Sequence, residues 1–172
     1  MYKLVFLFLT LLQATPIFSQ VKILPDACTL ITSPDINALF STIVKQQEMN
    51  APNNAVCTFR SDDNAVEVMI SQRALKDHET AAAFLKHDVD SITMDIANAQ
   101  PEITYTTIAA LEGAGAGTNY MTGIDPLMGP IVRLQFVLDK FLVTFDTKGI
   151  PVKTVIEHLP EIYKIISRNS GL

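Results

Sequence analysis

Residues 131–146 read IVRLQFVLDKFLVTFD, and this stretch decides the class of fold. Both halves, 131–138 and 141–146, are rich in valine, leucine, isoleucine and phenylalanine, which favour β-strands. Asp139-Lys140 interrupts the apolar pattern in the middle. Two such runs joined by two polar residues predict a β-hairpin. The chain therefore contains at least one antiparallel pair of strands.

A second hairpin is predicted upstream, over residues 55–61 and 65–72. In its second strand, valine and isoleucine alternate with polar residues and methionine, as in a strand with one buried face. Residues 102–111, rich in threonine, isoleucine and tyrosine, predict another strand. A short strand over 119–122 completes the set. We expect a mostly antiparallel sheet of about five or six strands.

Three helices are expected between and around these strands. Ser33-Pro34-Asp35 is typical of a helix start, and apolar residues then recur at helical spacing until about Gln47. A longer helix begins at Asp77 or Thr80 and continues to about Asn98. The third follows Pro151, and Pro160 is expected to kink or restart it. Hairpins combined with helices packed on one sheet define an α+β fold.

The first 20 residues resemble a secretory signal peptide. Lys3 precedes an apolar run from Leu4 to Leu12, and small or helix-breaking residues follow before Gln20. The run is shorter than the roughly 20 residues that span a bilayer. We therefore expect a signal peptide at 1–20, one domain at 21–172, and a periplasmic or secreted protein. No stable membrane insertion is expected after the signal is cleaved.

Charge and cysteine content limit the possible partners. The net charge of the chain is −5, and it becomes −6 once the signal peptide, with its single Lys3, is removed. A modestly acidic chain without a basic stripe is a poor ligand for nucleic acid. Cys28 and Cys57 are the two cysteines, and in an exported chain they predict a disulfide bond.

Two short motifs resemble those of exported bacterial domains of unknown function. Asp26-Ala27-Cys28-Thr29-Leu30-Ile31-Thr32 matches a D-x-C-x-L-[LI]-[ST] opening, and Cys57-Thr58-Phe59 matches a later C-x-[YF] strand. Gly115-Ala116-Gly117 before Asn119-Tyr120 is similar to a glycine turn in the same domains, although Thr118 replaces their acidic residue. The resemblance implies a PsbP-like α+β architecture and an exported location. It implies no catalytic residue.

No complete catalytic, metal or nucleotide motif is present, and no cofactor is expected. The glycine-rich segment 112–118 lacks the lysine and the serine or threonine of a phosphate-binding loop, so it predicts a connection between strands. His87, Asp90 and Ser91 would share one helix face, as a weak metal or acid–base cluster or as a solvated polar surface.

The segment Tyr120–Pro130 is the candidate binding region. Its glycine and proline content predicts a loop, yet it carries five large apolar residues: Tyr120, Met121, Ile124, Leu127 and Met128. Such a loop is either a lid or contact lip for a partner, or a segment folded back over the core.

These observations support three hypotheses of function. The first is an exported, non-catalytic domain that binds a protein partner, an envelope component or a small apolar ligand. The second is a small exported hydrolase whose acids converge only in the folded chain. The third is an accessory, inhibitor-like module that binds no small ligand.

Overall fold

The computed structural model describes residues 26–51, 54–98 and 105–171. The four helices of this part are α1 (Ala27–Leu30), α2 (Ser33–Phe40), α3 (His78–Ala97) and α4 (Val152–Asn169). The strands are β1 (Lys45–Ala51), β2 (Asn54–Arg60), β3 (Glu67–Ala74), β4 (Tyr105–Ala110), β5 (Asn119–Asp125), β6 (Gly129–Leu138) and β7 (Phe141–Lys148).

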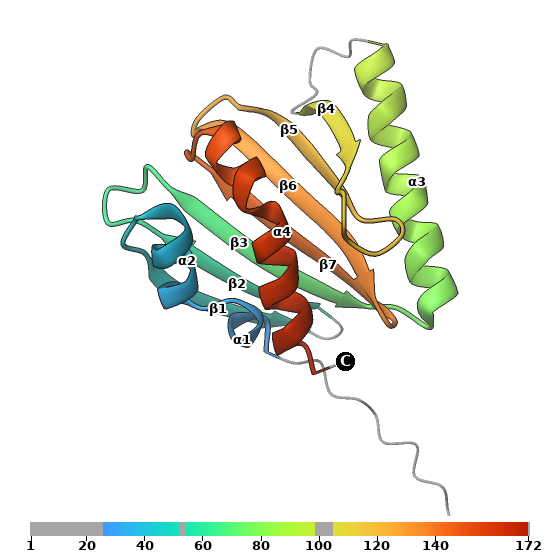
Figure 1. Cartoon of the computed structure of the whole chain (residues 1–172), viewed down its shortest axis with the longest axis horizontal. Coiled ribbons are helices and arrows are strands. Elements are labelled where there is room, and N and C mark those ends of the chain that lie inside the picture. Colours follow the sequence, from blue (N-terminus) through green and yellow to red (C-terminus); the bar gives the residue numbers. More distant parts are fainter. Residues whose placement is uncertain (1–25, 52–53, 99–104, 172) are drawn as a thin grey trace, which may run out of the picture.

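The strands form one sheet in the order β1-β2-β3-β7-β6-β5-β4, and every neighbouring pair is antiparallel (Figure 1). The α+β class and the predicted hairpins are confirmed. The expected count of five or six strands is wrong, because the described residues contain seven. The added strand is β1, at one edge of the sheet.

The predicted helix through Gln47 ends earlier, at Phe40. Thr32, rather than Ser33, is its N-cap, and Thr32 and Asp35 form a reciprocal capping box. Ser41 then adopts a left-handed conformation (φ 52°), which stops the helix. Residues 45–51 pair with β2 instead, although their polar sequence, KQQEMNA, has no strand-like alternation.

Helices cover the two faces of the sheet unequally. Helices α1 and α4 pack on one face, with α2 against α4, in front of the sheet in Figure 1. They enclose the main core, which includes the fully buried Phe59, Ile70 and Phe145. Helix α3 contacts β4, β6 and β7. Its Asp88 bonds to Gln135, which alternates with the core residues Leu134 and Phe136, so α3 lies on the opposite face.

The predicted disulfide joins Cys28 of α1 to Cys57 of β2, with the two Cα atoms 5.1 Å apart. Both cysteines are buried in the main core. The Asp26 carboxylate accepts a hydrogen bond from the Cys28 backbone N–H (2.8 Å) and so caps α1. The disulfide bond therefore fastens α1, the first described helix of the chain, to strand β2 of the sheet. The predicted signal peptide lies outside the described residues.

Helix α4 is continuous through Pro160, so the expected restart does not occur. Pro160 is exposed, while the side chains of Val155, Leu159 and Ile162 are buried against the sheet. In the described part of the chain, no helix is both long and apolar enough to cross a membrane.

Candidate functional site

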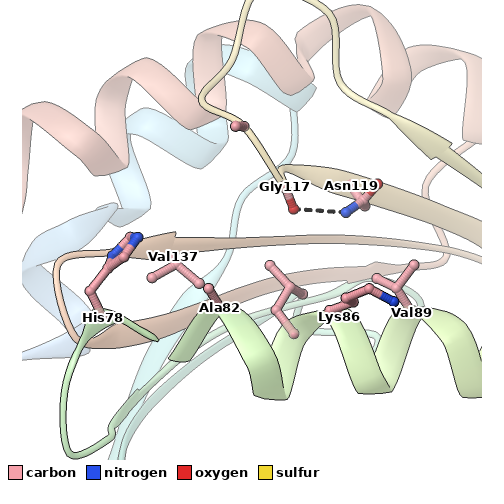
Figure 2. Close-up of a pocket in the computed structure, with 9 residues that line it drawn as sticks. His78, Ala82, Lys86, Val89, Gly117, Asn119 and Val137 are labelled. Carbon is pink, nitrogen blue, oxygen red and sulfur yellow. Dashed lines mark hydrogen bonds between the residues drawn. The ribbon is translucent and has the colours of Figure 1, made fainter. Parts of the chain in front are cut away.

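A pocket of about 270 Å³ lies between α3, strand β6 and the connection between β4 and β5. Helix α3 lines it with His78, Ala82, Leu85, Lys86 and Val89. Val137 of β6 contributes a further apolar wall, and Ala116, Gly117 and Asn119 lie across from the helix. Figure 2 shows α3 along one side of the pocket and the segment with Gly117 and Asn119 along the other. The lining is mainly apolar, with polar groups from three side chains.

The wall opposite α3 is the glycine-rich connection between β4 and β5. Gly113 and Gly117 adopt positive φ (76° and 83°), which confirms the predicted use of glycine in this turn. The turn is closed by a hydrogen bond from Leu111 N to Thr118 O (3.0 Å). The Asn119 side-chain amide donates to the Gly117 carbonyl (2.7 Å), shown as the dashed line in Figure 2. The turn is therefore held in a defined conformation beside the pocket.

Tyr163 of α4 also contacts this connection, from the opposite face of the sheet. Its hydroxyl oxygen accepts a hydrogen bond from the Gly115 backbone N–H (3.2 Å), and its ring packs edge-on against Phe136. A side chain at Gly115 would come within 3.1 Å of this hydroxyl. The position of the pocket wall thus depends on α4 as well as on the turn itself.

Besides Asn119, two further side chains that line the pocket already have polar partners. His78 Nδ1 lies 2.7 Å from the Asp139 carbonyl oxygen. Since a carbonyl oxygen only accepts, Nδ1 carries the proton and Nε2 is left for another partner. Lys86 Nζ forms an exposed ion pair with Asp90 Oδ2, one turn further along α3 (2.5 Å).

A polar cluster on the α3 face lies on the central strands. Arg133 of β6 donates two hydrogen bonds to Asp146 of β7, at 2.7 and 3.0 Å, and its guanidinium lies over the Tyr105 ring. Burial raises the pKa of the Tyr105 hydroxyl, and the negative charge of Asp146 raises it further. Burial alone would lower the pKa of Arg133, but its hydrogen bonds and attraction to Asp146 outweigh this and raise it. The cluster is a satisfied ion pair that fixes β6 against β7.

The Arg133–Asp146 pair gives a first stability prediction. Arg133→Met is expected to lower the free energy of unfolding by about 2 kcal/mol, because it leaves the buried Asp146 carboxylate without its partner. The double variant Arg133→Met/Asp146→Leu is expected to lose less than the single variant, since no charge is left buried. Urea unfolding of the unmodified protein, of the single variants Arg133→Met and Asp146→Leu, and of the double variant measures these losses of unfolding free energy. A double variant that loses the sum of both single losses would contradict this assignment.

The predicted loop Tyr120–Pro130 is not a loop. Residues 119–125 form β5 and residues 129–138 form β6, so only the tight turn between them is irregular. The apolar residues alternate across the strand and therefore separate. Tyr120 packs beside the main core, whereas Met121 is fully buried and pairs with Arg133 on the other face.

The remaining candidates, Ile124, Leu127 and Met128, lie at the tip of this hairpin. Ile124 is 68% exposed and Leu127 is 95% exposed, while Met128 is partly buried. The Asp125 carboxylate accepts hydrogen bonds from the backbone N–H groups of Met128 (2.9 Å) and Leu127 (2.8 Å), which lower its pKa. The structure thus brings three of the five predicted residues to one tip. None of the five lines the pocket.

Other candidate chemistry is dispersed. His87, Asp90 and Ser91 are exposed on α3, and among the described residues no three histidine, cysteine or acidic side chains are grouped as a metal site. Asp63 is exposed and Asp77 is half-buried, and hydrogen bonds from Ser61 and Thr80, respectively, lower their pKa. A lowered pKa means that the charged carboxylate form is favoured. A general acid needs a raised pKa instead, so that it keeps its proton.

The pocket residues were missed because their sequence pattern is that of an ordinary helix. The sequence did contain one signal of a close contact on this helix. Three small residues in one turn leave space for a neighbouring segment, and the helix has them at Ala81, Ala82 and Ala83. Only the fold shows which neighbour approaches. The glycine-rich connection was predicted as a turn, without its position beside α3.

The fold and the pocket together define an α+β domain with one antiparallel sheet and a small, mainly apolar pocket beside one helix. No protein-family model and no curated protein sequence matches the chain. In structure, the chain is similar to the extracellular domain of PknH from Mycobacterium tuberculosis. The TM-score is 0.51 and the identity 13%, over 84% of this chain and 93% of that one. At this identity the likeness concerns the fold alone.

Proposed function

We propose that this protein is an exported, non-catalytic domain that binds a small, mainly apolar ligand in the pocket beside α3. The observation that carries the proposal is the pocket itself, whose walls are formed largely by Ala82, Leu85, Val89 and Val137. Concave, largely apolar sites with a few polar groups are typical of small-molecule binding. The volume of this pocket, about 270 Å³, lies just below the range of roughly 300–1,000 Å³ for sites of drug-sized ligands.

The exported location is part of the same proposal. It is supported by the signal peptide predicted at 1–20, by the Cys28–Cys57 disulfide, and by the motif resemblance to exported bacterial domains. Disulfide bonds persist in oxidising compartments such as the periplasm and the extracellular space. The similarity to an extracellular domain agrees with this location.

A protein partner at the hairpin tip is the second candidate function. The specific observation is the exposure of Ile124 and Leu127, which are among the large apolar side chains the described surface leaves open. Asp125 holds the turn in place through its two backbone hydrogen bonds and its ion pair with Lys148 (3.4 Å). The tip is an apolar projection, whereas the pocket is concave, so the two candidates favour different kinds of ligand.

Filling the pocket tests the first candidate. Ala82→Leu adds three carbon atoms at the lining and is expected to weaken the binding of 1-octanol, used as an apolar probe, by about tenfold or more, because the probe loses space and apolar contact. Ala83→Leu is the matched control, since Ala83 is also exposed on α3 but does not line the pocket. Its affinity should equal that of the unmodified protein.

Calorimetric titration of the oxidised protein measures both affinities. Equal binding by the two variants would place the octanol elsewhere and overturn the assignment of the pocket. Absence of octanol binding to the unmodified protein would overturn the proposed ligand class.

A further inference from the structure

The side chains that line the pocket include a positively charged group but no negatively charged one. Its lining contains one lysine, one histidine and one asparagine, and no acidic residue. Lys86 is 76% exposed at its side chain, so its ammonium group is accessible from solvent. The rest of the lining is apolar, apart from His78, Gly117 and the side-chain amide of Asn119, which is already bonded to the Gly117 carbonyl.

We propose that the ligand is a short anionic amphiphile, with a carboxylate or similar group at Lys86 and an apolar body along Ala82, Leu85 and Val137. The inference rests on the proposed function of the pocket and specifies the chemistry of its ligand. An apolar body gains from burial in proportion to its area. A single cation beside the pocket then selects the charge of the head group.

Asp90 does not prevent this arrangement. Its bond to Lys86 is an i, i+4 pair in which both side chains are largely exposed, and such pairs contribute little to stability. A ligand carboxylate can therefore take the place of Asp90 at small cost, or share the ammonium group with it, because lysine has three donors.

Two further acidic groups at α3 have partners of their own. Asp88 accepts a hydrogen bond from the Gln135 side chain (2.9 Å), and Asp77 caps the helix by accepting one from Thr80 N (2.7 Å).

The two ends of the pocket are polar. In Figure 2, His78 lies beyond Ala82 at one end, and Lys86 lies towards the other end, beside Val89. The apolar body of the proposed ligand extends between His78 and Lys86.

Three probes with the same eight-carbon chain test the charge of the ligand: octanoate, 1-octanol and octylammonium. Octanoate is expected to bind on the order of tenfold more tightly than octylammonium, with octanol between them. Lys86→Gln should weaken octanoate by roughly two- to fivefold, the range of an exposed ion pair, and should weaken octanol less.

Lys153→Gln is the matched control. It removes a lysine that also forms an i, i+4 pair, with Glu157 (3.9 Å), but on α4 at the opposite face of the sheet. Its octanoate affinity should equal that of the unmodified protein. Equal loss in the two lysine variants would show an effect of net charge alone and would overturn the role of Lys86.

The remaining outcomes separate this inference from the proposed function. Octanol and octanoate binding equally, with no effect of Lys86→Gln, would overturn the anionic head group and leave the apolar pocket in place. Tighter binding of octylammonium would also overturn it. Failure of all three probes to bind would overturn the proposed function itself.

Discussion

The double variant Cys28→Ala/Cys57→Ala is expected to lose roughly 3.5 kcal/mol of unfolding free energy. The disulfide spans a sequence separation of 29 residues, and closing a loop of this length restricts the unfolded chain by about that amount in the chain-entropy model. The loss is a large fraction of the typical net stability of a domain, about 5–15 kcal/mol. Urea unfolding of the oxidised protein and of the variant measures it.

Binding at the pocket supplies the control for the disulfide variant. Cys28 and Cys57 lie in the main core, on the face of the sheet opposite α3. At a temperature where the variant is still folded, it should bind octanol with unchanged affinity. A stability loss below about 1 kcal/mol would contradict the entropic role assigned to the bond.

Gly149→Ala is expected to cost roughly 3 kcal/mol. Gly149 follows β7 with φ at 77°, where an L-residue is strained by about 1–2 kcal/mol. Its added Cβ would also overlap the backbone carbonyl oxygen of Ala65, in the turn between β2 and β3. Relief of this overlap requires the two backbone segments to separate, and overpacking of this kind costs about 1–3 kcal/mol more.

Gly113→Ala isolates the cost of the overlap. Gly113 has nearly the same φ (76°), but a Cβ there would meet nothing within 4 Å. Its substitution should cost about 1 kcal/mol, from backbone strain alone. Thermal or urea unfolding of both variants gives the difference. Equal losses would show that the close approach of Gly149 to Ala65 does not contribute.

Where an element packs apolar side chains against the rest of the domain, the sequence was sufficient to predict it. The hairpin of β6 and β7 follows from two runs of strand-favouring apolar residues joined by two polar ones, and the helix α3 follows from apolar residues spaced at about 3.6 residues. Strand β1 could not be predicted in this way. Its backbone pairs with β2 at the sheet edge, and pairing of backbone groups leaves no apolar pattern in KQQEMNA.

The candidate site was less predictable, for two physical reasons. Glycine and proline in Tyr120–Pro130 indicated a loop, yet Gly123 is buried within β5 and Pro130 lies near the start of β6, beside the turn. The pocket depends on contacts between segments far apart in sequence, α3 and the β4–β5 connection. Such a tertiary contact has no local signature, so the hairpin residues were predicted and the pocket residues were not.

Methyl NMR spectra of the oxidised protein during an octanoate titration test the central claim most directly. The account predicts that the largest shift changes occur at Leu85, Val89 and Val137, while Ile124 and Leu127 at the hairpin tip do not change. Changes confined to Ile124 and Leu127, with the three pocket residues unaffected, would contradict the assignment of the binding site to the pocket beside α3.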